Sequence, residues 1–387
     1  MGIYLDNHST TQLAPEAGAA MRPHWERPGN ANSPHRAGWD AADAIQNARQ
    51  KIATLIGAGP DEIVFTSGAT EADNLAITGA AHAARSADPR RRRIVVSSIE
   101  HKAVLLSADA MRAEGFEVVR IPVSTDGIAE IAVLEQLVSP ETCLVSVMAA
   151  NNEIGTLQPL KEVATIAHHH GALFHVDAAQ AAGRIPLDVF ALDVDYMSLS
   201  AHKMHGPQGV GALFVSSAAP TPTPLIRGGG QQGGVRSGTL PTALIAGFGV
   251  AADLATHGQE AHAARVARLA DLFVGELLAH QCRFTKMFEN GDQLPGSVSV
   301  CFSGIDADDL IQMLAERIFL STGAACNGGN MEPSHVLQAV GLSPEKSREF
   351  VRILFSRYND ENDAMAAGAT IADACLAVRL ATGRSHQ

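Results

Sequence analysis

The stretch Val194-Asp-Tyr-Met-Ser-Leu-Ser-Ala-His-Lys-Met-His-Gly-Pro-Gln-Gly-Val-Gly-Ala-Leu-Phe-Val215 is the most informative part of the chain for fold and chemistry. Its two apolar runs, Tyr196–Leu199 and Gly211–Val215, predict strands that are buried on both faces. Lys203 lies between them, and an ammonium ion is costly to bury unless it is paired or reacts. Desolvation lowers the pKa of a lysine and frees a nucleophilic amine, so Lys203 is a candidate nucleophile.

Two side chains beside Lys203 extend this hypothesis. Ser200 and His202 can both hydrogen-bond an anionic group such as a phosphate. The simpler interpretation is a loop lysine that points to water, which is the usual case for a lone lysine. The other motifs of the chain are therefore needed to distinguish a nucleophilic Lys203 from a solvent-exposed one.

Composition restricts the class of protein. The chain has 387 residues, of which 46% are hydrophobic and 18% charged, enough for a large core and more than one domain. The net charge of −12 argues against a nucleic-acid-binding surface. No apolar run approaches membrane-spanning length, and the N-terminus has no basic region followed by an apolar one. We therefore expect no membrane span, no secretory signal and a cytoplasmic location.

Apolar strands alternate with helical periodicity over the first two thirds of the chain. This alternation predicts an α/β fold with a mainly parallel sheet and helices on both faces. The predicted strands are Glu62–Thr66, Ile94–Ser97, Glu117–Ile121, Leu144–Met148, Ala172–His175 and Tyr196–Leu199, and the main helices are Ala14–His24, Arg36–Ile56, Ala129–Val138 and Leu160–His169. A smaller α+β unit is expected after the helices Thr242–His257 and Glu260–His280, with strands Phe284–Phe288, Ser297–Phe302 and Phe350–Phe355 and helices Ala307–Ala315 and Asp360–Leu380.

Polar side chains follow several of these strands. His101, Asn152 and Asp177 each come at or just after the carboxyl end of an apolar strand, where open α/β sheets bind ligands. The small residues around Ala69 and Thr70 form a turn into a helix, which suits an anion. Each of these polar residues, taken singly, is explained by turn formation. Taken together, they favour a single ligand-binding site at the strand ends. The adjacent histidines 168–170 cannot share one helix face, so we predict no metal site.

The five cysteines are scattered and odd in number, so they predict free thiols in a reducing compartment. Cys326 lies in a loop of small residues, from Leu320 to Asn330, ahead of a helix entered at Pro333. A thiol on an exposed loop can react, whereas a buried thiol is inert, and composition alone does not choose between them. The other cysteines, Cys143, Cys282, Cys301 and Cys375, lie in or beside apolar segments and are interpreted as small core residues.

Taken in order, the motifs resemble those of the NifS/IscS-type cysteine desulfurases. These are pyridoxal-phosphate (PLP) enzymes of the class V aminotransferase superfamily with the fold-type I architecture. The resemblance runs from Ile3 to about Arg379. It is carried by Thr66-Ser-Gly-Ala-Thr-Glu71, Glu100-His-Lys102, Asn151-Asn-Glu-Ile-Gly155, His175-Val-Asp-Ala-Ala-Gln180, Ser200-Ala-His-Lys203, Arg236-Ser-Gly-Thr239 and the Cys326 loop.

The resemblance implies an α/β large domain, residues 13–256, with a mainly parallel seven-stranded sheet flanked by helices. A smaller α+β domain, residues 1–12 and 257–387, would carry Cys326. The resemblance also implies that PLP is bound covalently by Lys203, paired with Asp177 and covered by His101, which could shuttle protons. The other implied PLP ligands are Ala69, Thr70, Asn152, Gln180, Ser200, His202 and, in the neighbouring subunit's site, Thr239; Arg352, Asn30 and Asn152 would bind the substrate.

The implied reaction converts L-cysteine to L-alanine. Lys203 moves the α-proton, and Cys326 takes the sulfur as a persulfide for a protein acceptor, with an iron–sulfur scaffold as one candidate. The enzyme would be a homodimer. The chain stops at Gln387, short of the longer tail of IscS-like proteins, which leaves the acceptor open.

Other functions stay open from the sequence. The same scaffold supports selenocysteine lyase activity, which would not need Cys326, and PLP-dependent amino transfer, which would yield keto acids. A Cys/His hydrolase would be colourless, and a non-catalytic sulfur-delivery or scaffold protein would tolerate loss of Lys203.

Overall fold

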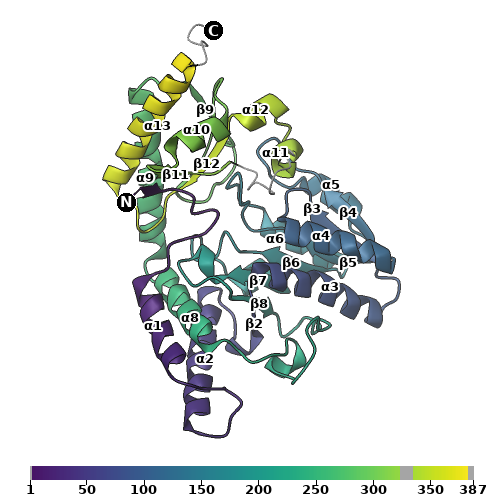
Figure 1. Ribbon diagram of the computed structural model, residues 1–387. Coiled ribbons are helices and arrows are strands. Elements are labelled where there is room, and N and C mark those ends of the chain that lie inside the picture. Colours follow the sequence, from purple (N-terminus) through teal and green to yellow (C-terminus); the bar gives the residue numbers. More distant parts are fainter. Residues whose placement is uncertain (1, 323–333, 382–387) are drawn as a thin grey trace.

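The computed structural model describes residues 2–322 and 334–381 (Figure 1). Its strands are β1 (Ile3–Tyr4), β2 (Ile63–Thr66), β3 (Arg93–Ser97), β4 (Glu117–Ile121), β5 (Thr142–Ser146), β6 (Leu173–Asp177), β7 (Tyr196–Ser200), β8 (Gly211–Val215), β9 (Phe284–Lys286), β10 (Ser297–Phe302), β11 (Ile318–Phe319) and β12 (Phe350–Leu354). Its α-helices are α1 (Pro15–Glu26), α2 (Arg36–Leu55), α3 (Ala69–Ala87), α4 (Lys102–Ala110), α5 (Ile131–Leu137), α6 (Leu160–His169), α7 (Val189–Leu192), α8 (Thr242–Thr256), α9 (Gln259–Ala279), α10 (Ala307–Leu314), α11 (His335–Ala339), α12 (Pro344–Arg348) and α13 (Glu361–Ala381).

The large sheet has seven strands in the order β2-β8-β7-β6-β5-β3-β4. The strands from β7 to β4 run parallel, while β8 runs antiparallel to both of its neighbours. The predicted α/β fold with a mainly parallel sheet is confirmed. The reversal at β8 follows from the short connection after β7, because a crossover to a parallel strand needs a dozen or more residues.

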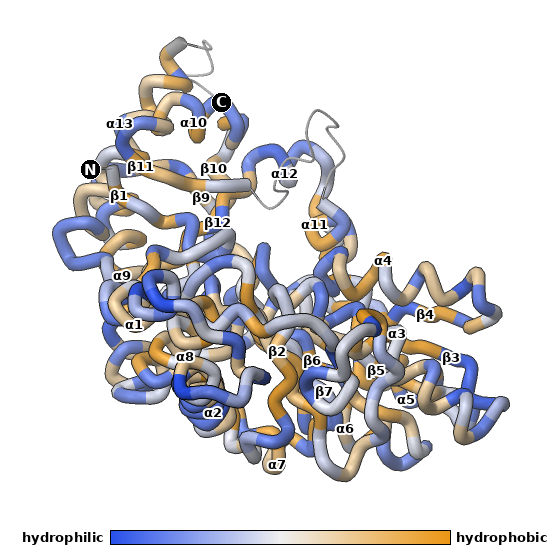
Figure 2. The backbone as a smooth tube through the Cα atoms, turned by 60° about the horizontal axis from the view of Figure 1, so that its bottom comes forward, coloured by the Kyte–Doolittle hydropathy of each residue, from blue (hydrophilic) through white to orange (hydrophobic). Residues whose placement is uncertain are grey.

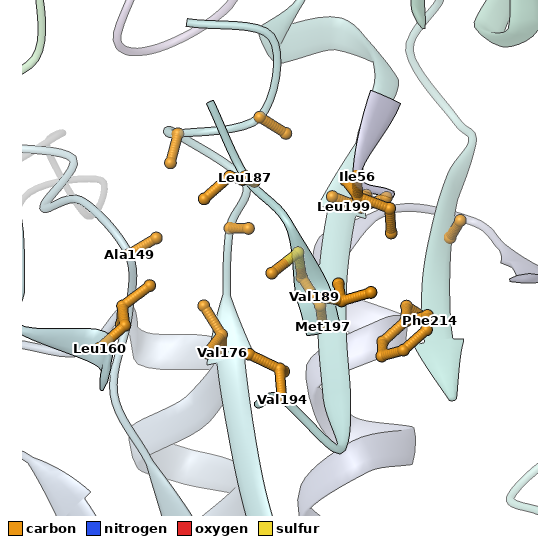
Figure 3. Close-up of a cluster of buried hydrophobic side chains, with 14 of the residues drawn as sticks. Ile56, Ala149, Leu160, Val176, Leu187, Val189, Val194, Met197, Leu199 and Phe214 are labelled. Carbon is orange, nitrogen blue, oxygen red and sulfur yellow. The ribbon is translucent and has the colours of Figure 1, made fainter. Parts of the chain in front are cut away.

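Both faces of this sheet are covered by apolar side chains, as expected for parallel strands joined through helices. Val176, Met197 and Phe214, from three neighbouring strands, lie on one face together with Ile56 and Val189 (Figure 3). Residues of opposite parity, such as Leu144, Tyr196 and Leu213, face a second cluster that includes α3 and α4. Figure 2 shows the apolar colour concentrated in the strands of the large sheet and the hydrophilic colour commonest in the connecting loops.

A smaller unit stands at one end of the molecule (Figure 1). Its antiparallel sheet has the order β12-β10-β9, and α9, α10 and α13 pack their apolar residues into the same cluster. The N-terminal Leu5 belongs to this cluster, and β1 pairs with β11. These contacts support the division into residues 13–256 and residues 1–12 with 257–387, which we keep as a proposal.

The predicted elements differ from the structure mainly at their ends. The strand expected at Leu144–Met148 is observed at Thr142–Ser146, although the chain stays bonded beyond it through Val147 N to His175 O at 3.1 Å. The helix expected to be entered at Pro333 begins at His335 with Ser334 as its N-cap. The pairing of β1 with β11 and the short helices α7 and α12 were not predicted, because they are too short to show a period.

The histidine run at residues 168–170 and the arginine run at residues 90–93 have local partners. His168 lies between Asp193 and Asp195, with Nδ1 3.0 Å and Nε2 2.9 Å from their carboxylate oxygens. Arg90 is exposed and pairs with Asp88. Within residues 2–322 and 334–381, no helix is long and apolar enough to cross a membrane.

The space around two glycines, one in α8 and one in α9, predicts opposite effects of their substitution by alanine. A Cβ on Gly249 would lie 2.5 Å from the Cα of Ala48, so Gly249→Ala should lower the free energy of unfolding by about 1–3 kcal/mol. Gly275, in α9, has nothing within 4 Å of an added Cβ, so Gly275→Ala should raise it by about 0.5–1 kcal/mol. Urea unfolding of both variants checks this; equal effects of the two substitutions would contradict the packing described.

Candidate active site

A pocket of about 520 Å³ opens where several strands of the large sheet end. It brings together most of the residues singled out in the sequence: Ala69, Thr70, His101, Asn152, Asp177, Gln180, Ser200, His202, Lys203 and Arg352. Asn30 and Thr239 are exposed and do not line this pocket of the single chain. Cys326 lies outside the described residues. The roles assigned to all these residues remain predictions.

Lys203 is the last residue of a 3-10 turn that lies between the apolar strands β7 and β8. Its Nζ donates to the carbonyl oxygens of His8 at 2.5 Å and Ser9 at 2.8 Å. Burial, reinforced by the charges of Arg184 and Arg352, lowers the pKa of Lys203 from 10.5 to about 7. A substantial fraction of this amine is therefore unprotonated and nucleophilic at neutral pH.

Asp177 is the last residue of β6, and it is buried beneath the pocket. Its Oδ1 accepts a hydrogen bond from the backbone N–H of Ala179 at 2.9 Å. Burial raises the pKa of Asp177, while Ala179 N–H and the nearby basic groups of His101 and Lys203 act in the opposite direction. A cationic ring nitrogen placed here would stabilise the charged carboxylate.

His101 is the N-cap of α4, directly after the turn that follows β3. Its Nδ1 accepts a hydrogen bond from the N–H of Ala103 at 3.1 Å, so the ring proton of the neutral form resides on Nε2. Burial lowers the pKa of His101, which favours this neutral form. The ring thus offers a flat face and one N–H to whatever binds in the pocket.

The other end of the pocket is suited to an anion. Ala69 and Thr70 open α3, whose first N–H groups have no partner within the helix. The backbones approach closely here, because a Cβ on Gly211 would lie 2.7 Å from the Cα of Gly68. Ser200 and His202 complete this end, and burial lowers the pKa of His202 to about 4. Neutral donors around a helix N-terminus fit a phosphate.

The small sheet contributes Arg352, the central residue of β12, which is buried. Its Nε donates to Ser321 Oγ at 2.8 Å and its Nη1 to the carbonyl oxygen of Asn152 at 2.9 Å. Its Nη2 lies 3.5 Å from Oδ1 of Asp6. The guanidinium is thereby held at the pocket wall, where it can meet a carboxylate.

Several residues in or beside the pocket were not recognised in the sequence. His8 and Ser9 supply the carbonyl oxygens that bind Lys203 Nζ. Arg184 donates from Nη2 to the carbonyl oxygens of Asn7 and Lys203, both at 2.9 Å. The polar run at residues 6–12 could have indicated His8 and Ser9, because polar groups that become buried need hydrogen-bond partners. Nothing in the local sequence distinguishes Arg184 from a surface arginine.

The environment of Lys203 predicts an unusual titration. In protein freed of cofactor, pulse labelling with an amine-reactive reagent should modify Lys203 with a pH midpoint near 7, because burial and two guanidinium groups disfavour its charged form. Lys51 and Lys286, which are partly exposed in ion pairs, serve as internal controls. Peptide mass spectrometry reads each site. A midpoint for Lys203 equal to that of the controls would contradict the burial described.

Comparison with known proteins identifies the family of the chain. The Aminotransferase class-V family model matches residues 3–366. The cysteine desulfurase IscS of Rickettsia typhi is 39% identical over 367 residues, which cover 93% of this chain and 88% of that protein. A cysteine desulfurase of Homo sapiens is also 39% identical over 367 residues, covering 93% of this chain and 79% of that protein.

Solved structures are similar over nearly the whole chain. A NifS-like protein superposes with a TM-score of 0.88 at 36% identity, covering 96% of this chain and 99% of that chain. A structure described as SspA in complex with cysteine superposes with a TM-score of 0.80 at 34% identity, covering 92% and 99%. The fold-type I architecture is confirmed by these likenesses. The chain belongs to the class-V aminotransferase family.

Proposed function

We propose that this chain is a PLP-dependent cysteine desulfurase that converts L-cysteine to L-alanine and collects the sulfur on Cys326. The observation that carries the proposal is the partly buried, readily deprotonated Lys203, which lines one pocket with Asp177 and Arg352. The relatives named cysteine desulfurase, and the SspA structure in complex with cysteine, support the same activity.

The residues present fit PLP. The pocket volume of about 520 Å³ accommodates a cofactor of this size. Ala69, Thr70, Ser200 and His202 would hold the phosphate, Asp177 the ring nitrogen, and Lys203 the aldehyde carbon. Asn152 and Gln180 would face the ring oxygen, and His101 its flat side. Gln180 Nε2 donates to His8 O at 2.8 Å, which leaves its second N–H available. When bound, PLP supplies an electron sink for the substrate carbon atoms.

Residues of the chain would bind the substrate, transfer protons and receive the sulfur. Arg352 binds the carboxylate of L-cysteine with its guanidinium, which is suited to two parallel hydrogen bonds. Lys203, as the free amine, would take the α-proton and later return a proton to the α-carbon, while the β-carbon would take the proton that Cys326 releases when it ionises. Neutral His101, with its Nε2–H, would assist these transfers. The Cys326 thiolate attacks the substrate sulfur, so an S–S bond forms as the C–S bond breaks, and alanine leaves.

The chain length permits this role for Cys326. Ser321 Oγ lies 2.8 Å from Arg352 Nε at the pocket wall. Cys326 follows five residues later, and five residues of chain span at most roughly 17 Å. The buried cysteines are poor alternatives, since burial raises the pKa of Cys143 to about 12 and that of Cys301 to about 11.

Further parts of the proposal rest on the family alone. We infer a homodimer in which Thr239 reaches the neighbouring site, a supporting role for Asn30, transfer of the persulfide to a protein acceptor such as an iron–sulfur scaffold, and a cytoplasmic location. The exposure of Thr239 and Asn30 is consistent with contacts to a second chain.

Substitution of Cys326 separates desulfuration from other PLP chemistry. Cys326→Ala should keep the yellow colour but form no alanine from L-cysteine, because no thiol receives the sulfur. Cys282→Ala, which removes a half-buried thiol, should keep the activity. Alanine and protein-bound persulfide are measured together by mass spectrometry. Selenocysteine lyase activity that survives in Cys326→Ala, or keto acids as products, would contradict the proposal.

Substitution of Arg352 tests substrate binding. Arg352→Gln should raise KM for L-cysteine about tenfold or more, because a charge-assisted pair in a buried site is lost. Arg317→Gln, which removes an exposed arginine of the small unit, should leave KM unchanged. Retained cofactor absorbance shows that the fold survives. Equal KM values for the two variants would exclude Arg352 as the carboxylate ligand.

A further inference from the structure

A second, much smaller cavity shares Lys203 with the pocket but none of its other lining residues. Its volume is about 20 Å³, which is enough for one guest of the size of a water molecule. Its wall comes from the turn at Lys203, from the start of α9 and from the segment after β12. It is therefore distinct from the cofactor pocket, although both share Lys203.

Every ionisable group in the wall of this cavity is basic. They are Arg184, Lys203, His205, His262 and Arg357, and the remaining lining residues are uncharged. His262 lies in the first turn of α9, so the positive end of that helix adds to the same field. Burial lowers the pKa of His205 to about 3 and that of His262 to about 4, so the full charges at this wall are those of Arg184 and Arg357. With no carboxylate among the lining residues, these charges favour an anion as the guest.

Arg184 has an unmatched donor at this cavity. Its Nη2 donates to the carbonyl oxygens of Asn7 and Lys203, but its Nη1 is buried and has no hydrogen-bond partner. Burial alone accounts for the lowering of its pKa to about 10, and no acidic group opposes it. A buried, unpaired guanidinium is costly, so a counter-ion here would stabilise the fold.

We propose that this cavity binds one monatomic anion, a halide such as chloride, beside Nη1 of Arg184. The volume is too small for phosphate, sulfate or a carboxylic acid. A water molecule would satisfy the N–H group but not the charge. The basic wall is what distinguishes this cavity from an ordinary internal water site.

The anion would also affect Lys203, and this part rests on the proposed function. Arg184 is one of the charges that lower the pKa of Lys203, so an anion beside Arg184 would raise that pKa. The groups facing Lys203 are Arg184, Arg352, Asp6, Asp177, His8, His101 and His202. Of these, only Arg184 lines the second cavity. Halide should therefore move the acidic limb of the activity profile to higher pH.

Diffraction provides the direct test. Crystals of the holoenzyme equilibrated with sodium bromide should show an anomalous peak in the cavity, next to Arg184. The same peak should vanish in Arg184→Gln. Density without an anomalous signal would identify the guest as water and overturn the proposal.

Thermal unfolding provides a test that does not depend on catalysis. At constant ionic strength, replacing sodium gluconate by sodium bromide should raise Tm of the holoenzyme by about 2 °C. Ala263→Leu fills the cavity and keeps every charge, so it should abolish the rise. Arg268→Gln, which removes an exposed arginine elsewhere on α9, should preserve it. An equal rise in all variants would show a general salt effect and exclude the site. Failure of the proposed desulfuration would change neither result.

Discussion

Burial of the Lys203 amine is the constraint on which the rest of the structure depends. An ammonium ion at this position costs free energy, and two backbone carbonyl oxygens from residues 8 and 9 meet it without supplying a negative charge. The pKa of Lys203 falls to about 7 as a result. The N-terminal arm, residues 3–12, pairs with β11 through β1, and its residues His8 and Ser9 line the pocket.

The two units meet around this amine through a few specific contacts. Arg352 of β12 bonds to the carbonyl oxygen of Asn152 in the large unit and lies near Asp6 of the arm. Asn7 donates to the carbonyl oxygen of Leu354 at 2.7 Å. The arm thus connects the small sheet to the lysine turn, and Arg352, the proposed substrate ligand, takes part in the contacts that hold the units together.

Much of this could be predicted from the sequence. The bounds of β8, β10 and α6 match the predicted segments, because each has a clear apolar period and a sharp turn beside it. The pocket residues at strand ends were predicted because parallel strands bring their carboxyl ends to one edge. Arg184 was missed, because its partners lie 177 and 19 residues away in sequence. Asn30 and Thr239 do not line the pocket of the single chain. Their motifs in the sequence did not indicate this.

We propose that Lys203, and no other lysine, carries the cofactor. The most direct measurement is borohydride reduction of the yellow protein, followed by peptide mass mapping. We expect a pyridoxyl mass on the peptide that contains Lys203, and fragmentation of that peptide should locate the modification on Lys203. The same mass on Lys102, the nearest lysine in sequence to His101, or on no lysine at all, would contradict it.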